Sequence, residues 1–269
     1  MLRKWLTPAN LPDGMTAKDF WQEATFSQAE IDNFSEIVDQ GSQTTLVCFS
    51  GLALGFAGLP SFEFRKSLQA ADKQFNLVFL RDIRRFWYHL TPEGESTGLD
   101  FYADQIQAIQ KKLGATRLIT LGVSAGGYAA LYFGQRLGAQ GILAFSPQTN
   151  LQRSIHWDWG ILRGLSKGWL KEQAMIAAVL RRRTRLLQEK MPMTQWGDLT
   201  QVQNPNPNTQ IHVYYCQENW LDTREANTVK ALKNVRFHGC TCSDHNVAGY
   251  LRERGELFSR LMESVGTTL

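Results

Sequence analysis

The sequence contains no long hydrophobic run and carries little net charge. Its longest apolar stretch, residues 46–59, is too short to span a membrane and is interrupted by three glycines. Basic residues exceed acidic ones by only four charges, and no basic stripe interleaved with aromatic residues is present. We therefore expect neither a membrane span nor a nucleic-acid partner. The first residues include basic side chains but no apolar segment behind them, so we also expect no signal peptide.

Cysteine is scarce, with four residues in a chain of 269. Cys48 and Cys216 fall in predicted buried strands, which is typical of reduced core thiols in a cytoplasmic protein. Cys240 and Cys242 lack a second ligand pair at zinc-finger spacing, so we expect no metal site. The sequence therefore predicts a cytoplasmic protein without a structural metal.

Two cofactor-binding patterns are also missing. The glycine-rich loop at residues 50–60 is not followed by the lysine and hydroxyl residue that a phosphate-binding loop needs. No Gly-x-Gly-x-x-Gly follows a predicted strand, which disfavours nicotinamide-dependent hydride transfer. We therefore expect no cofactor.

Strand-like and helical patterns alternate along most of the chain, whose composition is that of an ordinary globular protein. The predicted strands are residues 44–49, 76–80, 118–121, 141–145, 210–215 and 235–239. The predicted helices are residues 28–38, 61–74, 99–113, 128–137, 169–190, 223–232 and 244–265. This alternation predicts an α/β fold with a doubly wound, mostly parallel sheet of about six strands, covered by helices on both faces.

The alternation stops at residues 148–209, which we interpret as a helical cap inserted over the carboxyl edge of the sheet. Residues 44–147 and 210–269 then form the core, and residues 1–43 form an N-terminal extension. The predicted cap helix carries Arg181, Arg182, Arg183 and Arg185. These arginines fit an anionic substrate, an acidic partner or simply a solvated basic face.

A strand, a sharp turn and a helix surround Ser124 in the run GVSAG at residues 122–126. Such a turn presses the residues two before and two after the serine together, and glycines at 122 and 126 remove the Cβ atoms that would collide. The hydroxyl then lies at the positive N-terminus of the new helix, where a developing oxyanion is favoured. The pattern predicts a nucleophile elbow; a plain glycine–serine helix cap is the alternative.

A nucleophilic serine needs a base and a group that orients the base. In a doubly wound hydrolase sheet these follow in the order serine, acid, histidine, each after its own strand. Only His245 follows the last predicted strand, so we predict it to be the base. Glu218 and Asp222 both follow the strand at 210–215, and we rank Asp222 first and Glu218 second.

The remaining site residues are predicted from their position at strand ends. Backbone N–H groups of Ala125, after the serine, and Leu52, after the first core strand, are the candidate oxyanion donors. Gly51, Trp87 and Tyr88 follow carboxyl ends of strands, where α/β sheets bind ligands, and are candidate substrate-binding residues together with Trp157 of the cap. A mobile surface loop around residue 52 and ordinary aromatic packing are the alternatives.

With these residues identified, residues 44–265 resemble the α/β-hydrolase superfamily through GVSAG and through the order of Asp222 and His245. The segments SAGGYAALYFG (124–134), AFSPQT (144–149), WYH (87–89) and YYCQENWLD (214–222) are similar to a little-characterised group of bacterial hydrolase-like proteins. Some members of that group occur beside or fused to polysaccharide-biosynthesis or tetratricopeptide modules. In that group the aspartate that matches Asp222 recurs within an Asn-x-x-Asp pattern, which is why it ranks above Glu218. The sequence departs from the superfamily's pattern at two places. The His-Gly-Gly-Gly motif that supplies the oxyanion hole is replaced by Ser50-Gly51-Leu52-Ala53. The Gly-x-x-Asp that usually carries the acid is also absent, with Cys216 in place of the glycine and Asn219 in place of the aspartate.

These observations predict a serine hydrolase that cleaves an ester or thioester of a small-molecule acyl substrate through an acyl-enzyme on Ser124. An acyltransferase that uses the same intermediate is one alternative, because sequence does not distinguish water from another acceptor. A non-catalytic binding module on the hydrolase fold is the other. The sequence does not indicate the oligomeric state.

Overall fold

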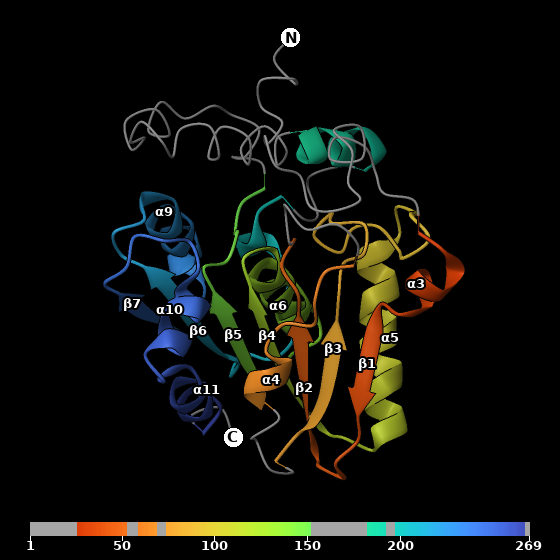
Figure 1. Ribbon diagram of the computed structural model, residues 1–269, viewed down its shortest axis with the longest axis horizontal. Helices are drawn as coiled ribbons and strands as arrows, with labels where there is room; N and C mark the ends of the chain where they lie inside the picture. The colour runs from red at the N-terminus through yellow and green to blue at the C-terminus, as the bar shows by residue number, and fades with distance from the viewer. Residues whose placement is uncertain (1–25, 53–58, 69–73, 152–181, 192–196, 267–269) are drawn as a thin grey trace.

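The computed structural model describes residues 26–52, 59–68, 74–151, 182–191 and 197–266, and it contains a seven-stranded sheet (Figure 1). The strands are β1 (Ser35–Val38), β2 (Thr44–Phe49), β3 (Asn76–Leu80), β4 (Arg117–Val123), β5 (Gly141–Phe145), β6 (Gln210–Cys216) and β7 (Val235–Cys240). Their order in the sheet is β1-β3-β2-β4-β5-β6-β7, and all neighbours are parallel except β1 and β3. The predicted doubly wound, mostly parallel sheet is therefore confirmed, with one strand more than expected.

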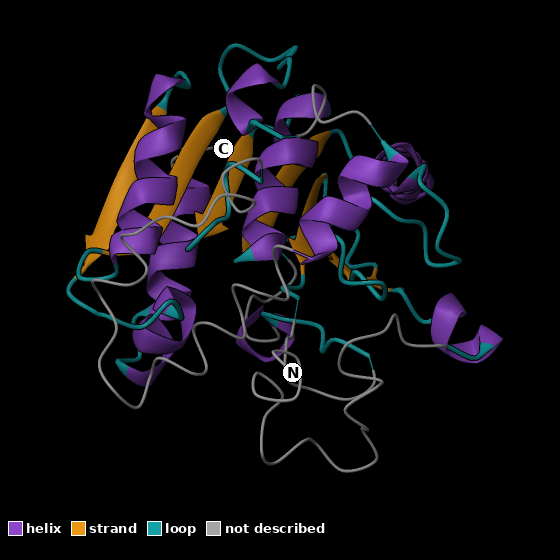
Figure 2. Ribbon diagram, turned by 90° about the horizontal axis from the view of Figure 1, so that it is seen from above, coloured by secondary structure: helices purple, strands orange, loops and turns teal. Residues whose placement is uncertain are grey.

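Helices cover both faces of this sheet, as the view from above shows (Figure 2). Besides a helical segment at 182–190, the described helices are α3 (Gln28–Asp32), α4 (Arg65–Leu68), α5 (Gly98–Leu113), α6 (Ala125–Arg136), α9 (Trp220–Thr228), α10 (Val247–Glu253) and α11 (Leu257–Gly266), with 3₁₀ turns η3 (Leu199–Gln201) and η4 (Val229–Ala231). The core cluster on one face includes residues of α5, α6 and α9, and the cluster on the other includes residues of α4, α10 and α11. Each of the central strands β2, β3 and β5 is buried along its whole length, which explains their continuous apolar sequences.

The additional strand β1 lies where the sequence predicted the end of a helix. Ser27 does open a helix through a capping box with Glu30, but that helix, α3, ends at Asp32. Residues Ser35–Val38 then pair antiparallel with β3. The prediction over 28–38 was wrong because the otherwise unpaired edge of β3 offers backbone partners to a segment ending in Ile37 and Val38, whose branched side chains suit a strand.

Two other helices differ from their predicted extents. The closing helix predicted at 244–265 is two helices, α10 and α11, separated at Gly255, whose φ of +72° ends a helix. Of the helix predicted at 61–74, the described residues contain only α4, which begins after Phe64. Phe64 has a φ of +63°, so the helix cannot extend back through this residue.

Residues 182–190 form the described part of the predicted cap helix, drawn in teal above the carboxyl ends of the strands (Figure 1). Arg183 donates hydrogen bonds to the carbonyls of Arg84 and Arg85 in the loop after β3, and its guanidinium lies over the ring of Phe86. Arg183 therefore connects the helix to the core, so its side chain does more than form a solvated basic face. Arg181 and Trp157 lie outside the described residues. No helix within the described ranges combines the length and the apolar content needed to cross a bilayer.

Candidate active site

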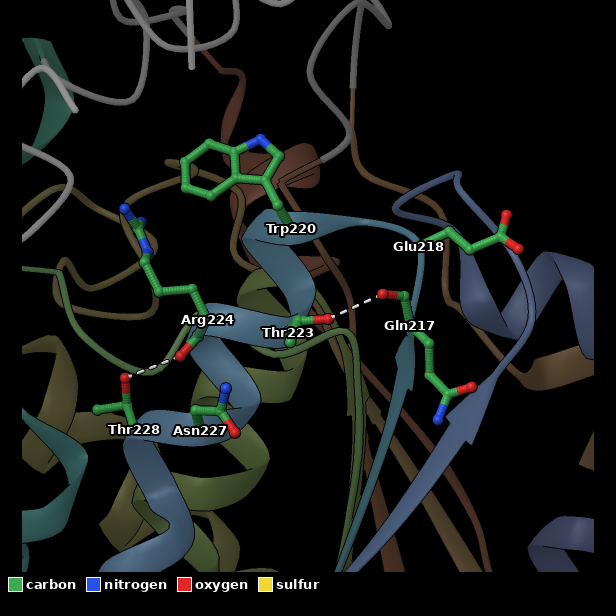
Figure 3. Close-up of a pocket in the computed structure, with 7 residues that line it drawn as sticks. All are labelled: Gln217, Glu218, Trp220, Thr223, Arg224, Asn227 and Thr228. Carbon is green, nitrogen blue, oxygen red and sulfur yellow. Dashed lines mark hydrogen bonds between the residues drawn. The ribbon is translucent and has the colours of Figure 1, made fainter. Parts of the chain in front are cut away.

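A cleft of about 660 Å³ opens on the outer face of α9 (Figure 3). It is lined by Gln217, Glu218, Trp220, Thr223, Arg224, Asn227 and Thr228. Glu218, the second candidate for the acid, is exposed, and its backbone N–H donates to the carbonyl of Cys242 at 3.2 Å. Neither Ser124 nor His245 lines this cleft. The carboxylate that contacts His245 is that of Asp222, the first-ranked candidate, whereas Glu218 lines this outer cleft.

Ser124 lies at the turn from β4 to α6, in a backbone conformation that L-residues rarely adopt, with φ of 55° and ψ of −115°. A Cβ atom on Gly122 would lie 2.0 Å from the carbonyl oxygen of Gly126, and one on Gly126 would lie 2.1 Å from that of Phe49. The Ser124 N–H donates to the carbonyl of Phe145 at 2.8 Å. Close backbone approaches on two sides therefore require both glycines and hold the serine at the sheet edge.

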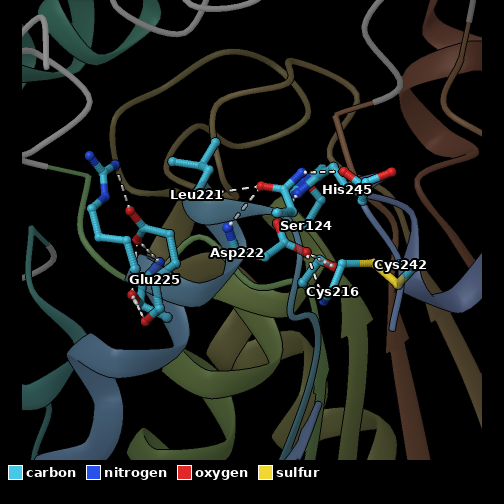
Figure 4. A network of polar contacts seen from close by, with 12 residues as sticks. Ser124, Cys216, Leu221, Asp222, Glu225, Cys242 and His245 are labelled. Carbon is cyan, nitrogen blue, oxygen red and sulfur yellow. Dashed lines mark hydrogen bonds and ion pairs between the residues drawn. A yellow bond between two sulfur atoms is a disulfide. The ribbon is translucent and has the colours of Figure 1, made fainter. Parts of the chain in front are cut away.

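His245 lies between β7 and α10 and contacts both Ser124 and Asp222 (Figure 4). Its Nε2 is 2.9 Å from Oγ of Ser124, and its Nδ1 is 2.6 Å from Oδ1 of Asp222. With Nδ1 protonated toward the carboxylate, Nε2 is free to accept the serine proton. The structure thus brings together three residues that lie far apart in the sequence.

Asp222 is in the first turn of α9, with only 2% of its surface exposed. Its N–H is capped by the side chain of Asn219, which also accepts the N–H of Leu221. Oδ2 accepts a hydrogen bond from Oγ of Ser146 at 2.6 Å and one from the N–H of Cys216 at 3.3 Å. These contacts leave Oδ1 directed at His245.

Ser146 was not identified from the sequence as a site residue. It directly follows β5 and has a φ of 41°, so its side chain reaches across to the Asp222 carboxylate. The sequence did contain a signal for Ser146, because it directly follows a predicted parallel strand and therefore lies at the sheet edge where ligands bind.

The surroundings of His245 act in opposite directions on its pKa. Burial lowers the pKa because it disfavours the charged imidazolium. The hydrogen bond to Asp222 and the negative charges of Asp222, Asp244 and Glu225 raise it, and together they place the pKa above its ordinary value. Asp222 therefore stabilises the protonated imidazole that a general base forms when it accepts a proton.

The predicted reduced state of Cys216 was wrong. Cys216, at the end of β6, forms a disulfide with Cys242, which follows β7 (Figure 4). The two strands are neighbours in the sheet, so their carboxyl ends bring the two cysteines together. Cys216 therefore does not support a reducing compartment. Cys48, in contrast, is a buried free thiol whose pKa is raised by burial.

Within the described residues, no three His, Cys, Asp or Glu side chains gather in a way that would hold a metal ion.

The two candidate oxyanion donors are backbone N–H groups near Ser124. Among the described residues, neither the N–H of Ala125 nor that of Leu52 has a hydrogen-bond partner. The Leu52 carbonyl accepts a hydrogen bond from Nε of Arg85 at 2.9 Å, which anchors the loop after β2. Gly51 lies beside the serine, since a Cβ atom at this position would be 3.8 Å from Cβ of Ser124.

Two of the three aromatic residues predicted to bind substrate, Trp87 and Tyr88, are completely buried. Trp87 donates from its indole nitrogen to the side chain of Gln148. The hydroxyl of Tyr88 donates to the carbonyls of Ser50 and Leu80, each at 3.0 Å, so this side chain ties the ends of β2 and β3 together. In this structure both residues support the loops around Ser124.

No protein-family model and no curated protein matches the sequence. Among solved structures, the chain is similar to a glycosylation-associated protein complex from Streptococcus agalactiae, with a TM-score of 0.53 and 18% identity over 84% of this chain. That similarity spans only 43% of the length of the other chain.

Two further structures are similar along most of their own length. A mutant of the capsule O-acetyltransferase of Neisseria meningitidis serogroup A in complex with CoA has a TM-score of 0.51 and 18% identity, covering 83% of this chain and 91% of that chain. A carboxylesterase structure from Nitrososphaera gargenis has a TM-score of 0.52 and 12% identity, covering 87% and 94%. At these identities the shared feature is the fold. The expected α/β-hydrolase fold is confirmed.

Proposed function

We propose that this α/β-hydrolase-fold protein is a serine hydrolase that forms an acyl-enzyme on Ser124 from a small-molecule ester or thioester. The observation that carries the proposal is the hydrogen-bonded series Ser124–His245–Asp222, with 2.9 Å between the serine and the imidazole and 2.6 Å between the imidazole and the carboxylate. A serine hydroxyl attacks a carbonyl only when a base removes its proton and a third group orients that base.

In the first half-reaction, Oγ of Ser124 attacks the substrate carbonyl while Nε2 of His245 accepts the hydroxyl proton. Asp222 holds the imidazole by its Nδ1–H and stabilises the resulting positive charge. The N–H groups of Ala125 and Leu52 are the proposed donors to the oxyanion of the tetrahedral intermediate. When the intermediate collapses, His245 returns the proton to the departing alkoxide or thiolate, and the acyl group remains on Ser124.

In the second half-reaction, His245 removes a proton from water as the water oxygen attacks the acyl carbon. The ester bond to Oγ then breaks, His245 protonates Oγ, and a carboxylic acid is released. The same steps regenerate the enzyme when an alcohol replaces water, with an ester as the product.

Labelling with a fluorophosphonate tests the activated serine, because this reagent reacts with a serine whose proton is removed by a neighbouring base. Intact-mass analysis of the wild type should show one adduct, which is absent from Ser124→Ala and forms much more slowly in His245→Ala. Ser259→Ala is the matched control, since Ser259 is an exposed serine on α11. A folded wild type that forms no adduct would contradict the proposal and favour a non-catalytic binding module.

An acyltransferase is the second candidate, and the similarity to the O-acetyltransferase structure with bound CoA favours it. Incubation with acetyl-CoA and a series of alcohols should then yield acetyl esters faster than free acetate. Ser124→Ala should abolish both products. If acetate forms at the same rate with and without alcohols, water is the acceptor and the hydrolase assignment holds.

A further inference from the structure

A buried carboxyl group that the proposed mechanism does not use, that of Glu63, lies beside Ser124. A Cβ atom on Gly51 would lie 3.4 Å from Oε1 of Glu63 and 3.8 Å from Cβ of Ser124. The carboxyl and the serine therefore flank the same point on the loop at residues 50–52, which we call the oxyanion loop. A glycine at position 51 leaves the space between them open.

The two oxygens of the Glu63 carboxyl have unequal surroundings. The backbone of Gly51 donates a hydrogen bond to the carboxyl. Oε2 is buried and has no hydrogen-bond partner within the part of the chain that the structure describes. Buried polar atoms in folded proteins are nearly always paired, and an unpaired one beside a reactive group is a candidate ligand contact.

The chain around Glu63 is anchored on both sides of the residue. Two positions before it, the carbonyl of Ser61 accepts a hydrogen bond from Oγ of Ser50 at 2.7 Å. The next residue, Phe64, packs its ring against that of Phe145 with centroids 5.6 Å apart. The carboxyl is therefore held in place before any ligand arrives, as a binding group must be.

We propose that Glu63 is a specificity-determining residue of the Ser124 site, whose Oε2 hydrogen-bonds a neutral hydroxyl group carried by the substrate close to the reacting carbonyl. This inference rests on the function proposed for Ser124 and deepens it. The hydroxyl belongs either to the acyl chain or to the alcohol that accepts it, and both have the same chemistry toward Oε2. When Glu63 is ionised, it repels a substrate that carries its own carboxylate at this position.

The protonation of Glu63 suits such a contact. Burial raises the pKa of Glu63 to about 7, against the opposing effect of the Gly51 hydrogen bond. Both forms of the carboxyl are then present near neutral pH, so Oε2 is able to donate or to accept a hydrogen bond. A hydroxyl group is the natural partner because it also does both.

The test measures the enzyme's preference for hydroxylated over matched unhydroxylated compounds in two arms. The donor arm compares the kcat/KM of p-nitrophenyl 3-hydroxybutyrate with that of p-nitrophenyl butyrate. The acceptor arm starts from p-nitrophenyl acetate and compares ester formation with glycerol and with 1-propanol. We expect the wild type to prefer the hydroxylated compound roughly ten-fold in one arm, which is the effect of one hydrogen bond to a charged or polar group.

Two variants of Glu63 are compared with a distant control. Glu63→Leu should abolish the preference, and Glu63→Gln, which keeps the shape and one acceptor, should retain part of it. Glu256→Gln changes a partly exposed glutamate just before α11, which pairs with Arg254, and should leave the preference unchanged. A residue that merely supported the fold would lower all rates together and would not change the ratio within an arm.

The outcomes are distinguishable from one another. Loss of the preference in the donor arm assigns the contact to the acyl chain, and loss in the acceptor arm assigns it to the alcohol. The inference is overturned if, in both arms, the ratio of rates with the hydroxylated and unhydroxylated compounds is the same in the wild type as in the folded Glu63 variants. That result would leave the acylation of Ser124 intact. If Glu63→Leu does not fold, the ratio in Glu63→Gln decides. Absence of a fluorophosphonate adduct on the wild type removes the function of Ser124 and this inference with it.

Discussion

The turn that carries Ser124 and the loops that carry Asp222 and His245 are held in place by different kinds of interaction. In the turn, the constraint is local, because Gly122 and Gly126 permit backbone contacts that any side chain would prevent. In the two loops, the constraint is tertiary. A disulfide joins the last residue of β6 to the chain just after β7, and side-chain hydrogen bonds complete the arrangement.

This difference separates two ways of damaging the site. A change of Gly122 or Gly126 acts on the backbone and therefore on folding as a whole. A change of Asp222 or His245 leaves the sheet and its two cores intact but removes or redirects a carboxylate or an imidazole. We therefore expect variants of Asp222 and His245 to be folded and inactive, and variants of the two glycines to be unstable.

The largest expected effect comes from Asp222→Asn, which keeps the size of the side chain but removes its charge. The amide no longer holds the correct tautomer of His245, so we expect kcat to fall by roughly 10⁴-fold at neutral pH. The free energy of unfolding should change far less than activity does. Steady-state kinetics and urea unfolding measure the two quantities on the same preparation.

The matched control for this substitution is Glu218→Gln on the exposed side of the same loop. We expect it to keep near wild-type activity, because Glu218 is exposed and the carboxylate that contacts the imidazole is that of Asp222. The opposite result, with Glu218→Gln inactive and Asp222→Asn active, would contradict the assignment of the acid and make the outer cleft the site.

The next effect is on stability, in the turn. In Gly126→Ala the added methyl group would lie 2.1 Å from the carbonyl oxygen of Phe49, and backbone cannot move aside as a flexible side chain does. We expect the free energy of unfolding to fall by about 3 kcal/mol, measured by urea denaturation. Gly266→Ala is the control, because a Cβ atom there meets nothing within 4 Å. Equal stability of the two variants would show that the turn is not sterically constrained.

The same contrast explains which features could be predicted from the sequence. The Ser124 turn could be located because its constraint lies within five consecutive residues. The strands β2, β3 and β5 could be located because burial along their whole length keeps their sequences largely apolar. His245 could be proposed because only one histidine follows the last predicted strand, and chain order is visible in a sequence.

Features that depend on contacts between distant segments could not be predicted. Strand β1 is a strand because β3 has an open edge, which the residues of β1 do not reveal. The Cys216–Cys242 disulfide requires β6 and β7 to be neighbours and in register. Glu63 was assigned no role because its position beside Ser124 depends on the path of the chain before α4.

Removing the disulfide tests whether it holds the acid and base loops. We expect Cys216→Ser combined with Cys242→Ser to lower the free energy of unfolding by about 3.5 kcal/mol, the amount expected for a closed loop of this size. Because Cys216 also donates its N–H to Asp222, kcat should fall as well, by roughly ten-fold.

Cys240→Ser is the matched control, since Cys240 is a free thiol at the end of β7 and lies close to Cys242 in the sequence. Treatment of the wild type with dithiothreitol should reproduce the double variant, with recovery after reoxidation. Unchanged activity in a double variant that is less stable would mean that the disulfide supports the fold without positioning the catalytic groups.

The smallest effect concerns pH and involves His245, the residue through which the loops contact the turn. The pKa of His245 is raised, so the protonated imidazole is favoured in the folded state, and its contribution to stability is complete below about pH 6.5, the unfolded value. That contribution is lost as the pH rises through the folded pKa. Activity requires the neutral imidazole, so kcat/KM should rise over the same range while stability falls.

The other described histidines, His89, His212 and His238, have lowered pKa values, so they make stability rise with pH only up to about 6.5, the unfolded value. Glu63, whose pKa is raised to about 7, makes stability fall with pH only up to that value. Above about pH 7, thermal unfolding should therefore show stability falling while the acylation rate rises. His245→Gln should remove this fall in stability above about pH 7 and leave activity uniformly low. A wild type in which stability and activity rise together would mean that Asp222 does not stabilise the imidazolium, and the acid–base loops would then serve only to position the imidazole.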